Sequence, residues 1–160
     1  MTVYDATRYD DTRPPISPRS AGEEVCQIAH YTNLGSLVAN DLVRLMKWPA
    51  GTVVSGVEAV CDDMDACATP TLTFSVGMLN DDGDDLDASG ILISSSTIGQ
   101  SGSVATRSHV AGFKYLSQQE DSNNNPTEKT IALKINTAAA TAAAGDVAVI
   151  CRFKAAEFGY

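Results

Sequence analysis

The fold is decided by the stretch Thr71–Leu79, which reads TLTFSVGML. Large apolar residues occupy alternate positions there, and these are Leu72, Phe74, Val76 and Met78. Small or polar residues fill the positions between them. A period of two residues is typical of a β-strand that buries one face. The sequence therefore predicts a half-buried strand in this stretch.

The same period recurs on both sides of this stretch. The predicted strands are Glu24–Thr32, Leu37–Lys47, Thr52–Cys61, Thr71–Leu79, Ile91–Ser95, His109–Ser117, Lys129–Asn136 and Asp146–Lys154. In the last two, the residues expected to face inward are Ile131, Leu133, Ile135, Val147, Val149, Cys151 and Phe153. About eight short strands at a spacing near ten residues predict an all-β fold, either an antiparallel sandwich or a barrel.

Two of the earlier strands give further expectations about faces. In Glu24–Thr32, one face carries Cys26, Ile28 and His30. In Leu37–Lys47, one side carries Val43 and Leu45, and the other carries Arg44 and Met46. Free cysteines on strands usually behave as small hydrophobic residues, so we expect Cys26 and Cys151 to be buried.

Polar and glycine-containing segments separate the strands. We expect turns at Trp48–Gly51 and at Asn80–Asp87, where Gly83 lies at the centre. Thr97–Ser103 and Glu120–Thr127 are predicted to be loops. The alanine-rich segment Thr137–Ala144 is expected to form one helical turn or a loop, because an isolated helix of this length is marginal.

The first 22 residues differ from the rest of the chain. Arg13–Arg19 reads RPPISPR, and its prolines exclude a helix because they fix φ and restrict the preceding residue. The sequence therefore predicts an extended N-terminal arm at residues 1–22 and a sandwich domain at residues 23–160. The arm either lies on a neighbouring subunit or is a partly disordered terminus.

The negative charge of the chain is concentrated in two segments. The formal net charge is -9, and the stretches Cys61–Cys67 and Asn80–Asp87 hold many of the aspartates and no basic residue. An acidic body argues against binding to nucleic acid and to anionic membranes, because both need a basic face. Colloidal solubility is the simplest use of this charge.

The sequence shows no apolar run long enough for a transmembrane helix and no hydrophobic region of a signal peptide near its start. We therefore expect synthesis in a cytoplasm. There thiols usually stay reduced. The spacing of the four cysteines does not fit a zinc site. Cys61 and Cys67 flank an acidic loop and could form a disulfide bond with each other.

Residue patterns for catalysis or for a cofactor are lacking. Thr97–Ser103 is rich in glycine and serine but has no lysine for a phosphate-binding loop. His30 and His109 are a small supply for acid–base chemistry. The spacing around Gly83 does not fit an EF-hand, so the aspartates there are either a solvated hairpin tip or an irregular calcium site. For the calcium alternative, the candidate ligands are Asp81, Asp82, Asp84 and Asp85. We expect no enzymatic activity, no cofactor and no metal.

Several short motifs resemble those of small head proteins of tailed bacteriophages. They are LVANDLVRL at Leu37–Leu45, WPAGTVV at Trp48–Val54, LTFSVG at Leu72–Gly77 and AAAGDVAV at Ala142–Val149. The resemblance covers about residues 30–154 and does not extend to the arm, the cysteines or the acidic loops. Many such proteins are capsid decoration, or cement, proteins.

The resemblance implies a jelly-roll-like β-sandwich on the outside of a phage capsid, made in the host cytoplasm. Its expected partners are the major capsid protein and further copies of itself, in a trimer rather than a dimer. An extended arm can add contacts on a neighbouring subunit. Tyrosine and arginine are enriched at binding hot spots. The arm residues expected at the interface are Tyr4, Tyr9, Arg13, Pro15 and Ile16.

A different function also fits a β-sandwich, since one fold serves many functions. The alternative is a carbohydrate- or receptor-binding module of a virion fibre or tail. Sugar binding usually needs exposed aromatic side chains, but only 6% of the residues are aromatic, and the single tryptophan, Trp48, precedes Pro49 at a turn. The composition therefore favours the capsid role over sugar binding.

Overall fold

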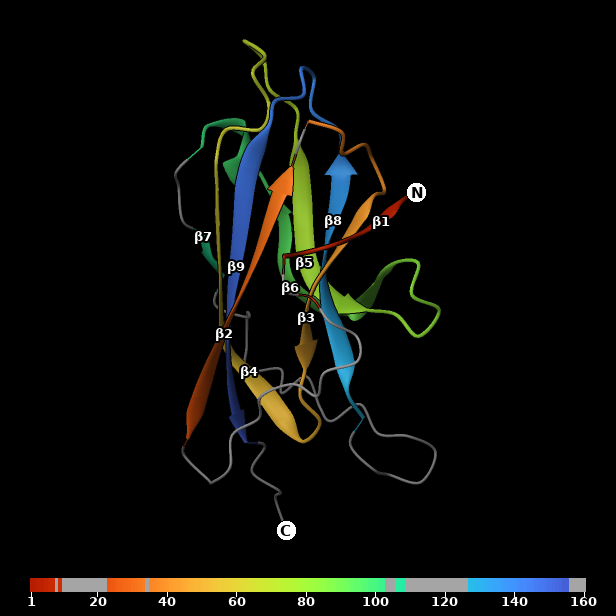
Figure 1. The fold of residues 1–160 in the computed structure, drawn as a ribbon, viewed down its shortest axis with the longest axis vertical. Coiled ribbons are helices and arrows are strands. Elements are labelled where there is room, and N and C mark those ends of the chain that lie inside the picture. The colour runs from red at the N-terminus through yellow and green to blue at the C-terminus, as the bar shows by residue number, and fades with distance from the viewer. Residues whose placement is uncertain (8, 10–22, 34, 103–105, 109–126, 156–160) are drawn as a thin grey trace.

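The computed structural model describes residues 1–7, 9, 23–33, 35–102, 106–108 and 127–155. Nine strands and one short 3-10 helix are found among these residues. They are β1 (Val3–Asp5), β2 (Glu24–Asn33), β3 (Leu42–Trp48), β4 (Thr52–Cys61), β5 (Thr73–Leu79), β6 (Leu86–Ser96), η1 (Ile98–Gln100), β7 (Thr106–Ser108), β8 (Lys129–Thr137) and β9 (Gly145–Ala155). Most strands run along the long axis of the molecule (Figure 1). The prediction of an all-β fold is confirmed.

The strands form two sheets in the order of a jelly roll. One sheet has the order β1-β3-β8-β5-β6 and the other has the order β2-β9-β4-β7. Four antiparallel pairs are nested within one another along the chain: β2 with β9, β3 with β8, β4 with β7, and β5 with β6. A long hairpin rolled up on itself gives this nesting, which defines the jelly roll. The predicted antiparallel sandwich is confirmed.

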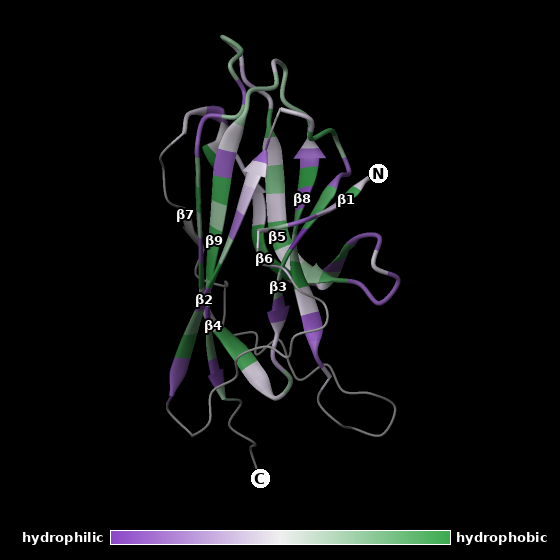
Figure 2. Ribbon diagram, in the orientation of Figure 1, coloured by the Kyte–Doolittle hydropathy of each residue, from purple (hydrophilic) through white to green (hydrophobic). Residues whose placement is uncertain are grey.

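The core lies between the two sheets and is built from alternate residues of each strand. Figure 2 shows hydrophobic residues along the strands of both sheets, whereas the turn between β5 and β6 is largely hydrophilic. All of the predicted inward residues of the deciding stretch, of β8 and of β9 are buried. The largest of them are Phe74 and Phe153, each with no exposed surface. Burying one such side chain contributes about 1.5–3 kcal/mol, so these alternating rows hold the two sheets together.

The prediction that Cys26 is buried was wrong. On β2, the residues that face the core are Ala29 and Tyr31, while Cys26 is exposed. Cys26, Ile28 and His30 do share a face, as expected, but it is the outer one. Polar residues lie in both phases of β2, with His30 in one and Gln27 in the other, so the alternation gave no clear inward face. Cys151 is buried on β9, as predicted.

The side predicted for Met46 was also wrong, and a β-bulge is the reason. Arg44 pairs with Ala132, and Met46 pairs with Ile131, so Leu45 is an extra residue on β3. Such an insertion shifts the alternation of side chains by one position. Both Leu45 and Met46 are therefore buried. This bulge also brings Trp48 into the core, where its ring lies 6.4 Å from that of Phe153.

The predicted turns are present, but two strand starts were wrong: β3 begins at Leu42 instead of Leu37, and β6 begins at Leu86 instead of Ile91. Gly83 has a φ of 75°, which a glycine adopts without strain, at the tip of the turn between β5 and β6. Residues 138–144 form a loop, the second of the two forms expected for Thr137–Ala144. Helix η1 lies within the predicted loop Thr97–Ser103. The predicted strand His109–Ser117 falls outside the described residues, as does most of the predicted loop Glu120–Thr127. The described residues contain no helix long and apolar enough to cross a membrane.

Candidate functional site

The first residues of the chain cross from one sheet to the other. Residues 1–7 and 9 are called the N-terminal strap here. β1 pairs in parallel with β3 of the first sheet. Two residues after β1, the backbone N–H of Thr7 donates to the carbonyl of His30 on β2, in the second sheet, at 2.7 Å. The strap therefore bridges the two sheets on one side of the sandwich, from β3 of the first sheet to β2, the edge strand of the second.

Buried contacts hold the strap in place. Ala6 is only 4% exposed, and its N–H donates to the carbonyl of Arg44 at 2.9 Å. The ring of Tyr4 lies 6.1 Å from that of Tyr31, a usual separation for packed aromatic pairs. Asp41, which is buried, accepts the N–H of Thr2 at 2.7 Å. The strap is thus part of the fold.

Arg44 contacts two residues of the strap through its side chain. Its guanidinium group donates two hydrogen bonds to the carboxylate of Asp5, at 2.6 and 3.1 Å. The same group lies 4.9 Å from the centre of the Tyr9 ring, within range of a cation–π interaction. The Tyr9 hydroxyl lies 3.4 Å from that of Thr130 on β8. These contacts involve partly exposed groups, so each contributes modestly to stability.

The five predicted arm residues therefore fall into two groups. Tyr4 and Tyr9 pack against this same chain, as part of the strap. Arg13, Pro15 and Ile16 lie outside the described residues, and their contact with a neighbouring subunit stays a prediction. Because the strap precedes these three residues and β2 follows them, the segment that carries them is anchored to the sandwich at both ends.

A second cluster gathers two distant loops around one carboxylate. Asp65, only 1% exposed, accepts the N–H groups of Thr71 and Leu72 at 2.7 and 3.0 Å. It also accepts those of Ala140 and Thr141, at 3.0 and 2.9 Å. These residues belong to the loop after β4 and the loop after β8, which lie together at one end of the molecule (Figure 1). Asp65 thus joins the two loops.

The charge state of Asp65 follows from these bonds. Burial by itself would raise the pKa of the Asp65 carboxyl, since it disfavours the charged form. The four backbone N–H donors outweigh burial and hold this pKa well below its ordinary value of 3.8. Asp65 is consequently a charged structural group at neutral pH.

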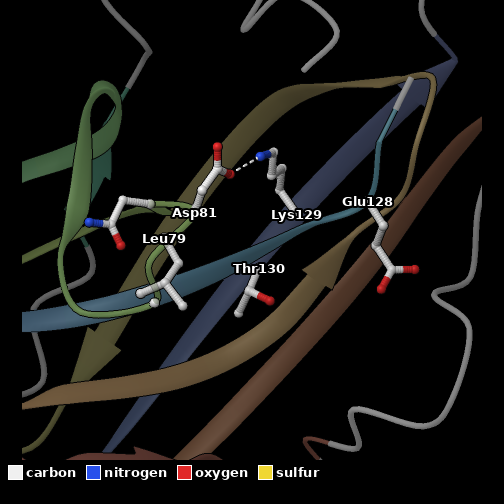
Figure 3. Close-up of a pocket in the computed structure, with 7 residues that line it drawn as sticks. Leu79, Asp81, Glu128, Lys129 and Thr130 are labelled. Carbon is white, nitrogen blue, oxygen red and sulfur yellow. Dashed lines mark hydrogen bonds and ion pairs between the residues drawn. The ribbon is translucent and has the colours of Figure 1, made fainter. Parts of the chain in front are cut away.

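The aspartate-rich turn is held by contacts within the chain. Lys129 pairs with Asp81, as Figure 3 shows, and Lys134 pairs with Asp85 at 2.7 Å. The hydrogen bond from Lys134 lowers the pKa of Asp85. Asn80 closes the turn by accepting the N–H of Asp84 at 3.0 Å.

Beside this turn lies an open pocket of about 250 Å³. The residues that line it are Leu79, Asn80, Asp81, Gly83, Glu128, Lys129 and Thr130. Its two carboxylates already have lysine partners, because Asp81 pairs with Lys129 and Glu128 pairs with Lys47. Within the described part of the chain, no three histidine, cysteine, aspartate or glutamate side chains gather as metal ligands. The calcium alternative at this turn stays untested.

The two cysteines of the predicted disulfide are free thiols in this structure. Cys61 is buried on β4, and burial together with the nearby Asp62 and Asp63 raises the pKa of its thiol to about 12. Cys67 is partly exposed in the following loop. The bond between them stays a prediction.

Sequence reasoning missed the two buried aspartates. The aspartates of Cys61–Cys67 form one acidic cluster in the sequence, and Asp65 has no local feature that separates it from Asp62 and Asp63. Its four donors come from segments that approach it only in the folded molecule. Asp41 is the last residue of the turn Val38–Asp41, where its own N–H donates to the carbonyl of Val38 and its carboxylate accepts the N–H of Val38, each at 3.1 Å.

The nested strand order and the closing strap define the chain as a β-sandwich of the jelly-roll class. No protein-family model and no curated protein sequence matches it. Solved structures from two phage capsids have a similar fold. A chain in the capsid of Ralstonia phage GP4 is 22% identical, with a TM-score of 0.78 over 98% of this chain and 99% of that chain. A chain in the asymmetric unit of the cyanophage Pam1 capsid is also 22% identical, with a TM-score of 0.53 over 91% of this chain and 95% of that chain.

At these identities the similarity establishes the fold alone. The similarity spans nearly the whole of both chains in each comparison, so each of these two phage capsids contains a chain of similar fold without large additions.

Proposed function

We propose that this chain is a structural protein of a virion, which binds the outer surface of a phage capsid and stabilises contacts between major capsid subunits. One observation carries the proposal: a jelly roll of nearly the same length is a chain in the capsid of Ralstonia phage GP4. A similar fold in a second phage capsid supports it. Fold alone does not fix function, so the proposal also needs properties of the surface.

The surface fits a position outside the shell. The chain carries a net charge of -9, and a protein that contacts packaged DNA is expected to be basic instead. Four of the 20 acidic residues lie in the turn between β5 and β6, which projects from the side of the sandwich (Figure 1). We place no catalytic step in this protein and regard its work as binding.

Residues 10–22 are the proposed contact with a capsid subunit. They join the strap to β2, so they form a connection anchored at both ends, and their prolines limit the conformations that binding must order. Arg13, Pro15 and Ile16 are the residues proposed to reach the shell. Many copies, each with a small contact, would gain strength through multivalency.

Substitutions in this segment test the proposed contact without disturbing the strap. Arg13→Glu combined with Ile16→Asp is expected to lower occupancy on purified capsids of the parent phage at least tenfold, as removal of two hot-spot residues does. Val38→Asp is the control, because Val38 is 55% exposed and lies elsewhere on the surface. Full occupancy by the double variant would show that this segment does not mediate binding.

Copies are also expected to associate with one another, and the resemblance to decoration proteins favours a trimer. The alternative function, a sugar- or receptor-binding module, receives less support. Every aromatic side chain in the described residues is buried or half-buried, and Trp48 is only 5% exposed. Retention on a glycan array, with no binding to capsids, would favour the alternative.

A further inference from the structure

The outer face of the four-stranded sheet carries an apolar centre. Ile28 is 65% exposed, the largest value among the exposed large hydrophobic residues of the described chain. It lies beside Ile150, its register partner on β9. The next row pairs Ala148 with Val60 on β4. All four side chains point away from the core, because the residues between them, such as Ala29 and Val149, face inward. The centre is therefore a continuous apolar stripe across three strands.

The two ends of this face have opposite charges along β9. At one end lie Arg152 and Lys154, both exposed. At the other end lies Asp146, next to Asp62, whose carboxylate accepts the Asp146 N–H at 2.9 Å. The side chain of Asp146 is 50% exposed and lies 3.4 Å from His30. The face thus runs from basic, through apolar, to acidic.

Two further acids modify this pattern without reversing it. Glu24 lies in register with Lys154 but accepts a hydrogen bond from the Ser55 hydroxyl at 2.7 Å. Glu58 borders the apolar stripe on the β4 side, as the register partner of Ile150. The basic end keeps two cations against one acid, so its charge is opposite to that of the Asp146 end.

From this pattern we propose that the outer face of the sheet formed by β2, β9 and β4 is a self-complementary interface, and that its occupant is a second copy of this chain. In the proposed pair, a twofold axis lies between the two faces, over the Ile28–Ile150 row and perpendicular to the strands. Rotation about this axis reverses the strand direction of the second copy. Lys154 of one copy then faces Asp146 of the other, and Ile28 faces its own equivalent. Arg152 lies over Ala148 of the other copy, and Glu58, in the row of Ile150, faces its own equivalent at the β4 margin of the contact. Such an isologous contact uses the same patch twice.

The size of the face sets the strength expected of the pair. Ten residues of a strand span roughly 33 Å, and three strands span about 15 Å, so the flat area is roughly 500 Å² per copy. This is below the 800 Å² per partner of a standard stable complex. Side-chain relief adds area, and the dimer is expected to be of moderate affinity and to depend on concentration. Dimers on a capsid would gain from the high local concentration.

The direct test is the native mass of the full chain by light scattering over a concentration series. The wild-type protein is expected to approach twice the 16.8 kDa of one chain as concentration rises. Ile28→Asp is expected to raise the dissociation constant at least about 30-fold, the effect of losing one hot-spot residue. Val38→Asp, which introduces the same charge at another exposed position, is expected to leave the dimer intact.

Charge exchange tests the proposed orientation independently of apolar contact. Lys154→Glu alone and Asp146→Lys alone each place like charges opposite one another, so each is expected to weaken the dimer. The double variant restores opposite charges across the axis and is expected to recover most of the lost affinity. Both positions are exposed, and circular dichroism confirms that the three variants fold.

A native mass of three chains, a monomer at every concentration, or a dimer that survives Ile28→Asp would overturn this inference. Failure of the double variant to recover affinity would overturn the orientation. The twofold contact departs from the trimer that the resemblance favours, and light scattering separates the two. None of these outcomes bears on capsid binding, which is measured separately on purified shells.

Discussion

At the scale of single residues, Asp65 has the clearest structural role. Its carboxylate is buried and accepts four backbone N–H groups from two loops that lie about seventy positions apart in the sequence. Hydrogen bonds to a charged acceptor are stronger than neutral ones. A neutral side chain at this position would leave donors of both loops without an adequate partner, which is costly in a buried site.

Asp65→Asn is therefore expected to lower the melting temperature by several degrees. An asparagine keeps the shape of the side chain but offers one carbonyl oxygen and an NH₂ group that competes as a donor. Asp82→Asn, at an exposed position of the turn between β5 and β6, is the control and should melt like the wild type. Differential scanning calorimetry makes the comparison, and equal melting temperatures for the two variants would contradict this role.

The same residue predicts how stability depends on pH. Because the pKa of Asp65 is lower in the folded state than its ordinary value of 3.8, its contribution is complete above that value. The contribution is lost as pH falls below about 4 toward the folded-state pKa. Wild-type melting temperature should thus fall more steeply below pH 4 than that of Asp65→Asn. Parallel curves would show that other carboxylates dominate acid unfolding.

At the scale of elements, the strap shows how tertiary contacts give structure to a segment with little pattern of its own. β1 has three residues, too few for a period-two pattern to predict. It forms because β3 presents an unpaired edge, and because Ala6 and Tyr4 find an apolar surface beside Tyr31. The bulge at Leu45 is a second local feature that alternation alone did not reveal.

Removal of residues 1–9 is expected to lower the free energy of unfolding by roughly 1–3 kcal/mol, the net worth of a few backbone hydrogen bonds. Urea denaturation followed by circular dichroism measures it. Val3→Ala, at a position that is 41% exposed, serves as the control and should change stability by less than about 0.5 kcal/mol. A truncated chain as stable as the wild type would mean that the strap contributes nothing to the sandwich.

At the scale of the whole molecule, the sequence predicted the strands better than their arrangement. Strong alternation in Thr71–Leu79 and Asp146–Lys154 fixed both the strand type and the buried face, because each has a large apolar residue at every second position. Alternation does not say which strands pair. The jelly-roll order came instead from the family resemblance, and the nested pairs confirm it.

The candidate site was less predictable than the fold. Contacts of Asp65 and of the strap join positions far apart in the chain, and no local spacing records them. The apolar centre on the outer sheet face was hidden because β2 has moderately hydrophobic residues in both phases, with Ile28 on one face and Tyr31 on the other. Choosing the inner face required knowing which residues the opposite sheet covers.

The central claim is that this protein binds a phage capsid from outside and stabilises it. The most direct measurement adds the purified protein to capsids of the parent phage that lack it, and follows co-sedimentation together with the temperature at which the shells release DNA. We predict saturable binding and a higher release temperature for decorated shells. An absence of binding to intact capsids would contradict the claim.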